Sequence, residues 1–285
     1  MHIVITGARG RLGSKLQTLL EDSHRITAID LPETDLSLPQ SVEQVAGLQP
    51  DLVIHCAAWT DVDGCARDPE RALRINAFGT KHVALACQRN NAPLVHISTN
   101  EVFDGRKATP YNEYDPPAPI NPYGYSKWVA EQIVRELVPR HYIVRLSWLI
   151  AHGGGNFVQT VLRLAQEGKP LRVVTNEIAA PTYNDDLAAA LVRLIATEHY
   201  GTYHLVNEGA VSRWGLARFV LDHTGFAHVP IEPIVLAQYP RPSTPPEASV
   251  LANTAAALLG IRLRPWQEAV LAFLEKEGRL VNHPA

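Results

Sequence analysis

The first residues of the chain join a short apolar strand pattern to a glycine-rich turn, and this feature restricts the fold more than any other. Residues 2–6 are mostly β-branched, the glycines follow at Gly7, Gly10 and Gly13, and residues 11–21 have a helical pattern. Glycines at this spacing permit a tight turn and close packing of a helix on a strand. The free N–H groups of such a helix favour a phosphate at its N-terminus. A strand, turn and helix in this order predict a dinucleotide-binding site.

The first half of the chain continues this alternation of strands and helices. Strands are predicted at 25–30, 52–55, 93–98 and 142–147, and helices at 41–46, 69–89 and 123–136. The alternation predicts right-handed crossovers and therefore a parallel sheet with helices on both faces. We expect an α/β fold with a Rossmann-like, doubly wound parallel sheet.

The second half is less regular and predicts a smaller lobe. Helices are expected at 157–166, 185–197, 254–259 and 266–277, with another running from Ser212 to residue 223; strands are expected at 171–175 and 202–206, and a loop at the proline-rich residues 239–246. We assign residues 1–150 to an NAD(P)-binding domain and residues 151–285 to a C-terminal α/β lobe that binds the substrate. Residues from about 184 to 206 are expected to rejoin the first sheet.

Composition disfavours several classes of function. The formal net charge is −3 and there is no basic run, so we expect no nucleic-acid partner. No apolar stretch approaches the ~20 residues of a membrane span, and the N-terminal apolar run is too short for a signal peptide. Cys56, Cys65 and Cys87 form no Cys-x-x-Cys pair. We therefore expect free thiols, no metal, no membrane partner and a cytoplasmic location.

Residues around the glycine turn extend the predicted cofactor site. Asp30 ends the second strand about 20 residues after the glycines, where a carboxylate bonds the adenosine ribose. Arg9, inside the turn, is instead suited to a 2′-phosphate. Asp30 favours NAD(H) and Arg9 favours NADP(H), so we expect both cofactors to bind, with a slight preference for NADP(H). Further cofactor contacts are expected from Arg11, Leu12, Asp35, Leu36, Ala57, Ala58 and Thr60. Asn76 is either a buried polar hub or a helix N-cap.

A tyrosine and a lysine stand four residues apart just after an Asn-Pro pair that starts a helix well. On a helix, Tyr123 and Lys127 share a face, whereas Tyr125 points elsewhere. An ammonium group and an oxidised nicotinamide ring are expected to lower the phenol pKa from about 10. Tyr123 is then suited to protonate a carbonyl oxygen while hydride reaches its carbon. Thr99, directly after the fourth strand, is placed to hold that carbonyl.

These motifs resemble the extended short-chain dehydrogenase/reductase family, and most closely its dTDP-4-dehydrorhamnose reductase branch. The likeness covers nearly the whole chain, because residues 98–105, 145–148, 156–157 and 180–182 share the branch's patterns. It implies NAD(P)H-dependent reduction of the 4-keto group of a nucleotide-linked deoxysugar. It also implies that the catalytic set is Thr99, Tyr123 and Lys127, and that Thr99, Asn100, Glu101, Trp148, Asn156, Phe157 and Arg241 contact the substrate. A homodimer is compatible with this family.

Two departures from the branch leave alternatives open. Residues 99–101 read Thr-Asn-Glu where the reductases have Thr-Asp-Tyr, and they are similar to the Thr-Asp-Glu of nucleotide-sugar dehydratases. However, an amide cannot act as an acid. The Arg-Pro pair expected shortly before a Ser-x-Leu is displaced, at Arg241-Pro242. One alternative is a nucleotide-sugar epimerase or dehydratase. The other is a non-catalytic NAD(P)-binding regulatory subunit, which the intact Thr99, Tyr123 and Lys127 disfavour.

Overall fold

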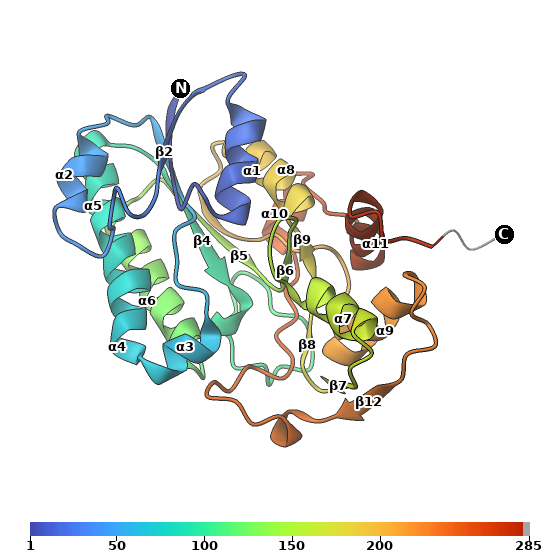
Figure 1. The fold of residues 1–285 in the computed structure, drawn as a ribbon. Helices are drawn as coiled ribbons and strands as arrows, with labels where there is room; N and C mark the ends of the chain where they lie inside the picture. Colours follow the sequence, from blue (N-terminus) through green and yellow to red (C-terminus); the bar gives the residue numbers. More distant parts are fainter. Residues whose placement is uncertain (282–285) are drawn as a thin grey trace.

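A computed structural model describes residues 1–281, in which helices cover both faces of a central sheet and a smaller lobe adjoins it (Figure 1). The sheet has the strand order β10-β5-β4-β3-β1-β2, and every neighbouring pair is parallel. Its strands are β1 (His2–Thr6), β2 (Arg25–Ile29), β3 (Leu52–His55), β4 (Leu94–Thr99), β5 (His141–Leu146) and β10 (Gly201–His204). The predicted doubly wound α/β fold is confirmed.

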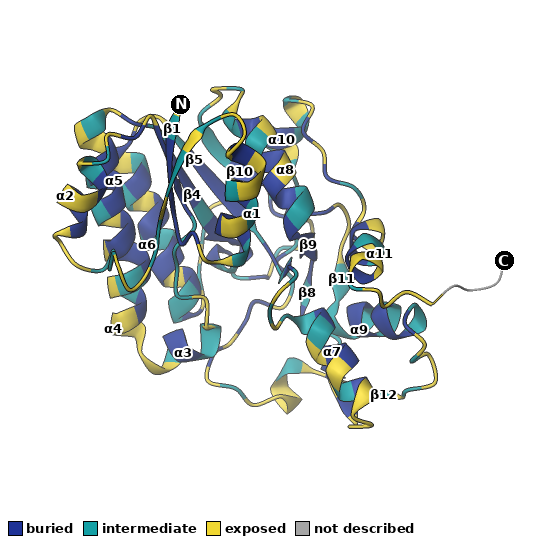
Figure 2. Ribbon diagram, turned by 45° about the horizontal axis from the view of Figure 1, so that its top comes forward, coloured by how far each residue is buried: buried dark blue, intermediate teal, exposed yellow. Residues whose placement is uncertain are grey.

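Alternate residues of each strand face different helical layers. The surrounding helices are α1 (Arg11–Leu20), α2 (Ser41–Ala46), α5 (Gly79–Asn90), α6 (Pro122–Leu137), α8 (Asn184–Ile195) and α10 (Thr254–Leu258). Ile3 and Ile5 of β1 pack towards α1, α8 and α10, whereas Val4 packs towards α5 and α6. Figure 2 shows the inner strands β1, β4 and β5 as mostly buried and the outer sides of these helices as exposed. Coverage on both faces explains why the inner strands are mostly apolar.

The position of the site follows from the order of the strands. β2 lies on one side of β1 and β3 on the other, so the chain changes its direction across the sheet between β1 and β3. In open parallel sheets, ligands bind outside the carboxyl ends of the strands at such a point. Three segments lie at this edge: the glycine turn after β1, residues 56–60 after β3 and residues 99–101 at the end of β4.

The helix predicted over 69–89 is interrupted. It consists of α4 (Pro69–Ala72), a π-helical segment (Leu73–Phe78) and α5, and it follows a short helix that we did not predict, α3 (Val62–Arg67). Asn76 lies in the π-helical segment and is almost fully buried. Its Oδ1 accepts a hydrogen bond from Trp59 N (2.7 Å), and its Nδ2 donates to Ser126 Oγ (3.0 Å). The polar-hub interpretation of Asn76 is confirmed, and the helix-cap interpretation is wrong.

The smaller lobe has its own apolar core between helices and a two-stranded sheet. Its helices are α7 (Phe157–Gln166), α9 (Arg213–Asp222) and α11 (Trp266–Lys276), and its sheet pairs β7 (Leu171–Val174) with β12 (Ile231–Ile234). Asn156 caps α7 and Ser212 caps α9, as predicted, and residues 239–246 form an irregular loop. The pairs β6 (Leu149–Ile150) with β9 (Thr182–Tyr183) and β8 (Ile178–Ala179) with β11 (Val211–Ser212) were not predicted, because two-residue strands show no periodicity.

Three further properties concern the described part of the chain. No helix in residues 1–281 is both long enough and apolar enough to cross a membrane. No group of three or more His, Cys, Asp or Glu side chains in the same residues is arranged to hold a metal ion. Cys56, Cys65 and Cys87 are free thiols.

Candidate active site

A groove follows the carboxyl edge of the sheet in two connected sections. The first section has a volume of about 380 Å³ and the second about 530 Å³. Gly7, Gly10, Cys56 and Ala58 line both sections, so the two form one continuous groove. The glycine turn therefore lies where the sections meet.

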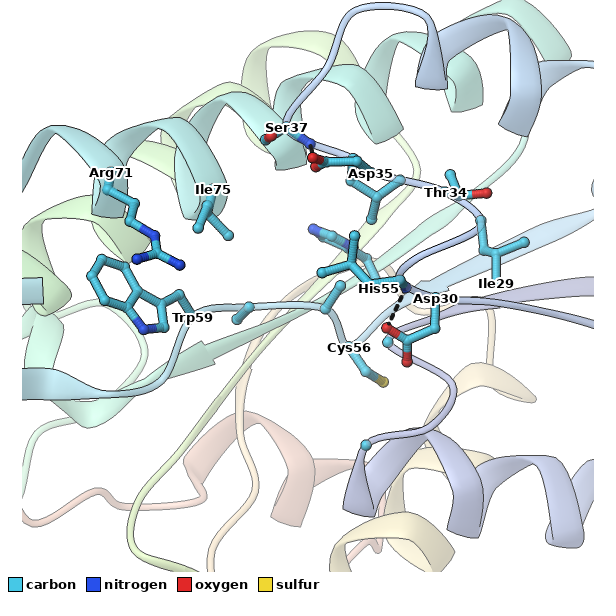
Figure 3. Close-up of a pocket in the computed structure, with 16 residues that line it drawn as sticks. Ile29, Asp30, Thr34, Asp35, Ser37, His55, Cys56, Trp59, Arg71 and Ile75 are labelled. Atoms are coloured by element: carbon cyan, nitrogen blue, oxygen red, sulfur yellow. Dashed lines mark hydrogen bonds between the residues drawn. The ribbon is translucent and has the colours of Figure 1, made fainter. Parts of the chain in front are cut away.

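The first section contains the residues predicted to contact the adenosine half of a dinucleotide. Asp30, Asp35, Leu36 and Ala57 line it. Figure 3 shows that Asp30 lies near one end and that Trp59 and Arg71 lie together at the other. The Arg71 guanidinium lies 4.6 Å from the centre of the Trp59 ring. Sequence reasoning did not include these two residues, because the unpredicted α3 lies between them in the chain.

The glycine turn has the shape that a dinucleotide diphosphate requires. Gly7 has φ +65°, and a Cβ there would lie 2.5 Å from Ala57 N. A Cβ at Gly13 would lie 2.3 Å from the carbonyl oxygen of Gly7. Both positions therefore need glycine. Helix α1 follows Gly10 without any side-chain cap, which leaves N–H groups of its first turn for an anion. Gly10, Arg11 and Leu12 line the second section, so the residues present fit the predicted NAD(P)(H).

Arg9 and Asp30 differ in how they relate to this groove. Asp30 lines it, and its oxygens accept hydrogen bonds from Arg9 N (2.7 Å) and Leu31 N (2.8 Å). The Arg9 guanidinium instead donates to both oxygens of Glu33, at 2.9 and 2.7 Å, and Arg9 lines neither section. A 2′-phosphate would therefore compete with Glu33 for Arg9. Glu33 escaped the sequence analysis because nothing in its local pattern connects it to residue 9.

The three predicted catalytic side chains come together in the second section. Thr99 at the end of β4 and Tyr123 and Lys127 on α6 all line it, together with Thr60. Lys127 is only 2% exposed, whereas Tyr125 is 46% exposed. The prediction that Tyr125 faces away from the Tyr123–Lys127 side of the helix is confirmed.

Burial is the largest influence on the pKa values of Lys127 and Tyr123. It lowers the pKa of Lys127 to about 8, against the opposing effect of Glu131. Burial, and then the nearby Glu101, raise the pKa of Tyr123 above its usual value, while a hydrogen bond from Thr99 acts the other way. The predicted lowering of the Tyr123 pKa is therefore wrong for the protein without ligands. Its phenol stays protonated at neutral pH, which is the state that a proton donor needs.

A second group of side chains lies where the lobe meets the groove. Trp148 lines the second section, and the guanidinium of Arg213 lies 3.6 Å from the centre of its ring and 5.1 Å from that of Phe157. Glu177 holds Arg213 in an ion pair of 2.9 Å. Phe157, Arg213, Glu177 and Arg241 line an adjoining cavity of about 470 Å³. Sequence reasoning missed Arg213 and Glu177, because a single arginine on an amphipathic helix has no recognisable motif.

The remaining predicted substrate residues have different environments. Arg241 lies in the irregular loop and forms an ion pair with Asp63 of α3 at 2.9 Å, so this loop is attached to the larger half of the protein. Asn100 donates from its amide to Ser249 Oγ at 2.5 Å and lines the second section. Asn156 instead donates to the Ala151 carbonyl while it caps α7, and it does not line the groove.

Comparisons with known proteins agree with this geometry. The family model described as the RmlD substrate binding domain matches residues 1–278. The chain belongs to this family. It is 36% identical to the spore coat polysaccharide biosynthesis protein SpsK of Bacillus subtilis, covering 97% of this chain and 98% of that protein. It is 38% identical to the dTDP-4-dehydrorhamnose reductase of Mycobacterium tuberculosis, covering 96% and 92%. The dTDP-4-dehydrorhamnose reductase of Bacillus anthracis, solved in complex with NADP, superposes with a TM-score of 0.91 at 37% identity, covering 96% and 99%.

Proposed function

We propose that this RmlD-family protein uses NADPH to reduce the 4-keto group of a dTDP-linked deoxysugar, as dTDP-4-dehydrorhamnose reductases do. One observation carries the proposal: Tyr123 and Lys127, on one side of α6, line the same groove as the glycine turn. A proton donor and a dinucleotide cradle on one groove are what a reductase requires. Relatives named dTDP-4-dehydrorhamnose reductase support the choice of substrate.

Each residue then has a physical task. NADPH, when bound, supplies the hydride. The glycine turn and the start of α1 would hold its diphosphate, and Lys127, which lines the groove, would bond its ribose. Thr99 orients the carbonyl oxygen of the sugar, and the Tyr123 phenol donates its proton to that oxygen. The raised pKa of Tyr123 keeps that proton in place until the negative charge develops.

The lobe supplies charges for the rest of the substrate. Arg213 lies over Trp148, beside Phe157, and Arg241 lines the same cavity. One guanidinium group can donate two parallel hydrogen bonds to phosphate oxygens. These two arginines are therefore suited to bind the nucleotide diphosphate. The nucleotide then extends from the catalytic section of the groove into the cavity of the lobe.

The alternatives are less well supported by the geometry. A dehydratase needs an acid after Thr99, but Asn100 is an amide whose nitrogen is committed to Ser249. A purely regulatory subunit would have no use for Thr99, Tyr123 and Lys127 on one groove. The division into domains at residue 150, the homodimer and the cytoplasmic location stay predictions.

A panel of substrates tests the proposal. The purified protein would be mixed with NADPH or NADH and with dTDP-, UDP- or GDP-linked 4-keto-6-deoxysugars, and cofactor oxidation would be followed by absorbance. We expect oxidation of NADPH with the dTDP-linked sugar, and stoichiometric formation of the reduced sugar nucleotide. Conversion of the keto sugar into an isomer without any cofactor consumption would favour an epimerase. A dehydratase would instead form a 4-keto-6-deoxysugar from a sugar nucleotide that still carries its 4- and 6-hydroxyl groups. Absence of turnover with every sugar would favour the regulatory subunit.

A further inference from the structure

A carboxyl group whose role the proposed reaction does not explain lies beside the catalytic tyrosine. Glu101 belongs to a short 3₁₀ turn (Asn100–Val102) directly after Thr99, and it lines the groove together with Thr99 and Tyr123. A ketone reduction needs one proton donor, which is Tyr123. The second acidic group at this place therefore calls for a separate explanation.

The two oxygens of the Glu101 carboxyl differ in their hydrogen bonding. Asn121 accepts the Gly124 N–H with its Oδ1 (2.8 Å), so its amide nitrogen must point away from α6. That nitrogen donates to Glu101 Oε2 (2.6 Å) and to the Thr244 carbonyl (3.2 Å). In residues 1–281, Glu101 Oε1 makes no hydrogen bond, although the carboxyl lines the groove. This oxygen is free for a ligand.

The charges around Glu101 stabilise its ionised form only weakly. Within the described residues it forms no ion pair, because the arginines that face it are committed elsewhere: Arg213 to Glu177 and Arg241 to Asp63, both at 2.9 Å. Burial opposes ionisation most strongly, the Asn121 hydrogen bond favours it, and the charge of Glu177 opposes it. The other titratable groups facing it, the phenol of Tyr123 and the thiol of Cys65, are neutral at pH 7. The result is a pKa of about 7 for Glu101.

Binding of a nucleotide-sugar should shift Glu101 towards its neutral form. Its diphosphate is anionic, and by the proposed function it occupies Arg213 and Arg241, which are the groups that favour the carboxylate of Glu101. Its sugar displaces water from the groove. Added negative charge and loss of water both favour the neutral carboxyl.

We infer that Glu101 takes up a proton from solvent when the nucleotide-sugar binds, and that its neutral carboxyl then donates a hydrogen bond from Oε1 to the sugar. This inference rests on the proposed function. The proton remains on Glu101 during the reduction and is released with the product, so it is separate from the proton that Tyr123 transfers. Glu101 is thus a substrate-binding residue that makes affinity depend on pH.

Calorimetry tests this directly in the absence of turnover. The complex with NADP⁺ would be titrated with the product, dTDP-rhamnose, at pH 7.5 in buffers of different ionisation enthalpy. We expect uptake of roughly 0.5 to 0.8 proton per site, since a group with a pKa near 7 is mostly ionised at this pH. Affinity should then fall towards about tenfold per pH unit above pH 8.

Two variants make the result specific to Glu101. Glu101→Gln resembles the neutral carboxyl and keeps an oxygen for Asn121, so we expect binding within about threefold of wild type at pH 7.0, with proton uptake close to zero and affinity nearly independent of pH. Glu43→Gln changes an exposed glutamate on α2 and should keep the wild-type uptake. Binding of dTDP-rhamnose without proton uptake, or equal uptake in Glu101→Gln, would overturn the inference. Absence of binding to wild type would instead contradict the proposed function.

Discussion

The candidate active site has a cofactor half, which is the groove around the glycine turn, and a substrate half, which is the adjoining cavity with the residues around it. The two halves present different parts of the chain to their ligands. The cofactor half consists largely of backbone: a positive-φ glycine, the open first turn of α1 and the small residues after β3. The substrate half consists of charged side chains that meet across long distances in the sequence, such as Arg213 with Glu177 and Arg241 with Asp63. The comparison shows that one half depends on shape and the other on charge. Substitutions should therefore affect them differently.

The largest effect is expected at the point where the halves meet. Tyr123→Phe removes the proton donor and keeps the ring, so turnover should fall by about 10²-fold or more while NADPH binding stays unchanged. Steady-state kinetics and a fluorescence titration of NADPH measure the two quantities. Tyr125→Phe, on the exposed side of the same helix, is the matched control and should retain wild-type turnover. A Tyr123→Phe protein as fast as wild type would remove Tyr123 from the mechanism.

NADPH binding should weaken when the glycine turn cannot pack closely against Ala57 after β3. In Gly7→Ala, the added Cβ meets Ala57 N at 2.5 Å, so the turn must move away from β3. We expect the NADPH dissociation constant to rise by about tenfold or more, because a misplaced turn loses several N–H contacts to the diphosphate. Gly153→Ala is the control: this glycine also has a positive φ (+74°), but no atom lies within 4 Å of the added Cβ. Equal effects of the two substitutions would mean that backbone strain, rather than the close approach to β3, determines binding.

Substrate binding should weaken when the positive charge of Arg213 is removed. Arg213→Met removes the guanidinium over Trp148 and keeps an apolar side chain, so the KM for the sugar nucleotide should rise about tenfold, the usual value of one charge-assisted hydrogen bond. NADPH binding should not change, which separates this half from the other. Arg163→Met, in an exposed ion pair of the same lobe, should leave both quantities unchanged. A rise in the NADPH dissociation constant in Arg213→Met would show that the halves are not independent.

The same contrast explains which parts of the site sequence reasoning could find. The glycine turn and the Tyr123–Lys127 pair depend on residues a few positions apart, so their spacing already determines their geometry on a turn or a helix. The sheet was predictable for a similar reason, since alternating strand and helix patterns permit few topologies. All of these features depend on local order in the chain.

The features that escaped prediction are formed by tertiary contacts. Arg213 and Glu177 meet only because β8 pairs with β11, which directly precedes α9. Glu33 meets Arg9 only because β2 pairs with β1. The pKa shift of Tyr123 in the protein without ligands has the opposite sign to the prediction, because its burial and the approach of Glu101 cannot be known before the fold is. Ion pairs between distant segments have no signature in a single sequence.

The smallest expected effect concerns the choice between NADPH and NADH. Here the side chain of Arg9 contributes to the cofactor half, which otherwise consists largely of backbone. Glu33→Gln removes the charge that holds Arg9, so the guanidinium becomes available to the 2′-phosphate that distinguishes NADPH from NADH. Both side chains are more than 60% exposed, so the preference for NADPH, measured as a ratio of kcat/KM values, should rise only about two- to fivefold. Glu43→Gln disrupts a similar exposed pair with Arg89, away from the groove, and should leave the ratio unchanged. A ratio that shifts towards NADH in Glu33→Gln would mean that Arg9 does not reach the phosphate, and that Asp30 alone sets the preference.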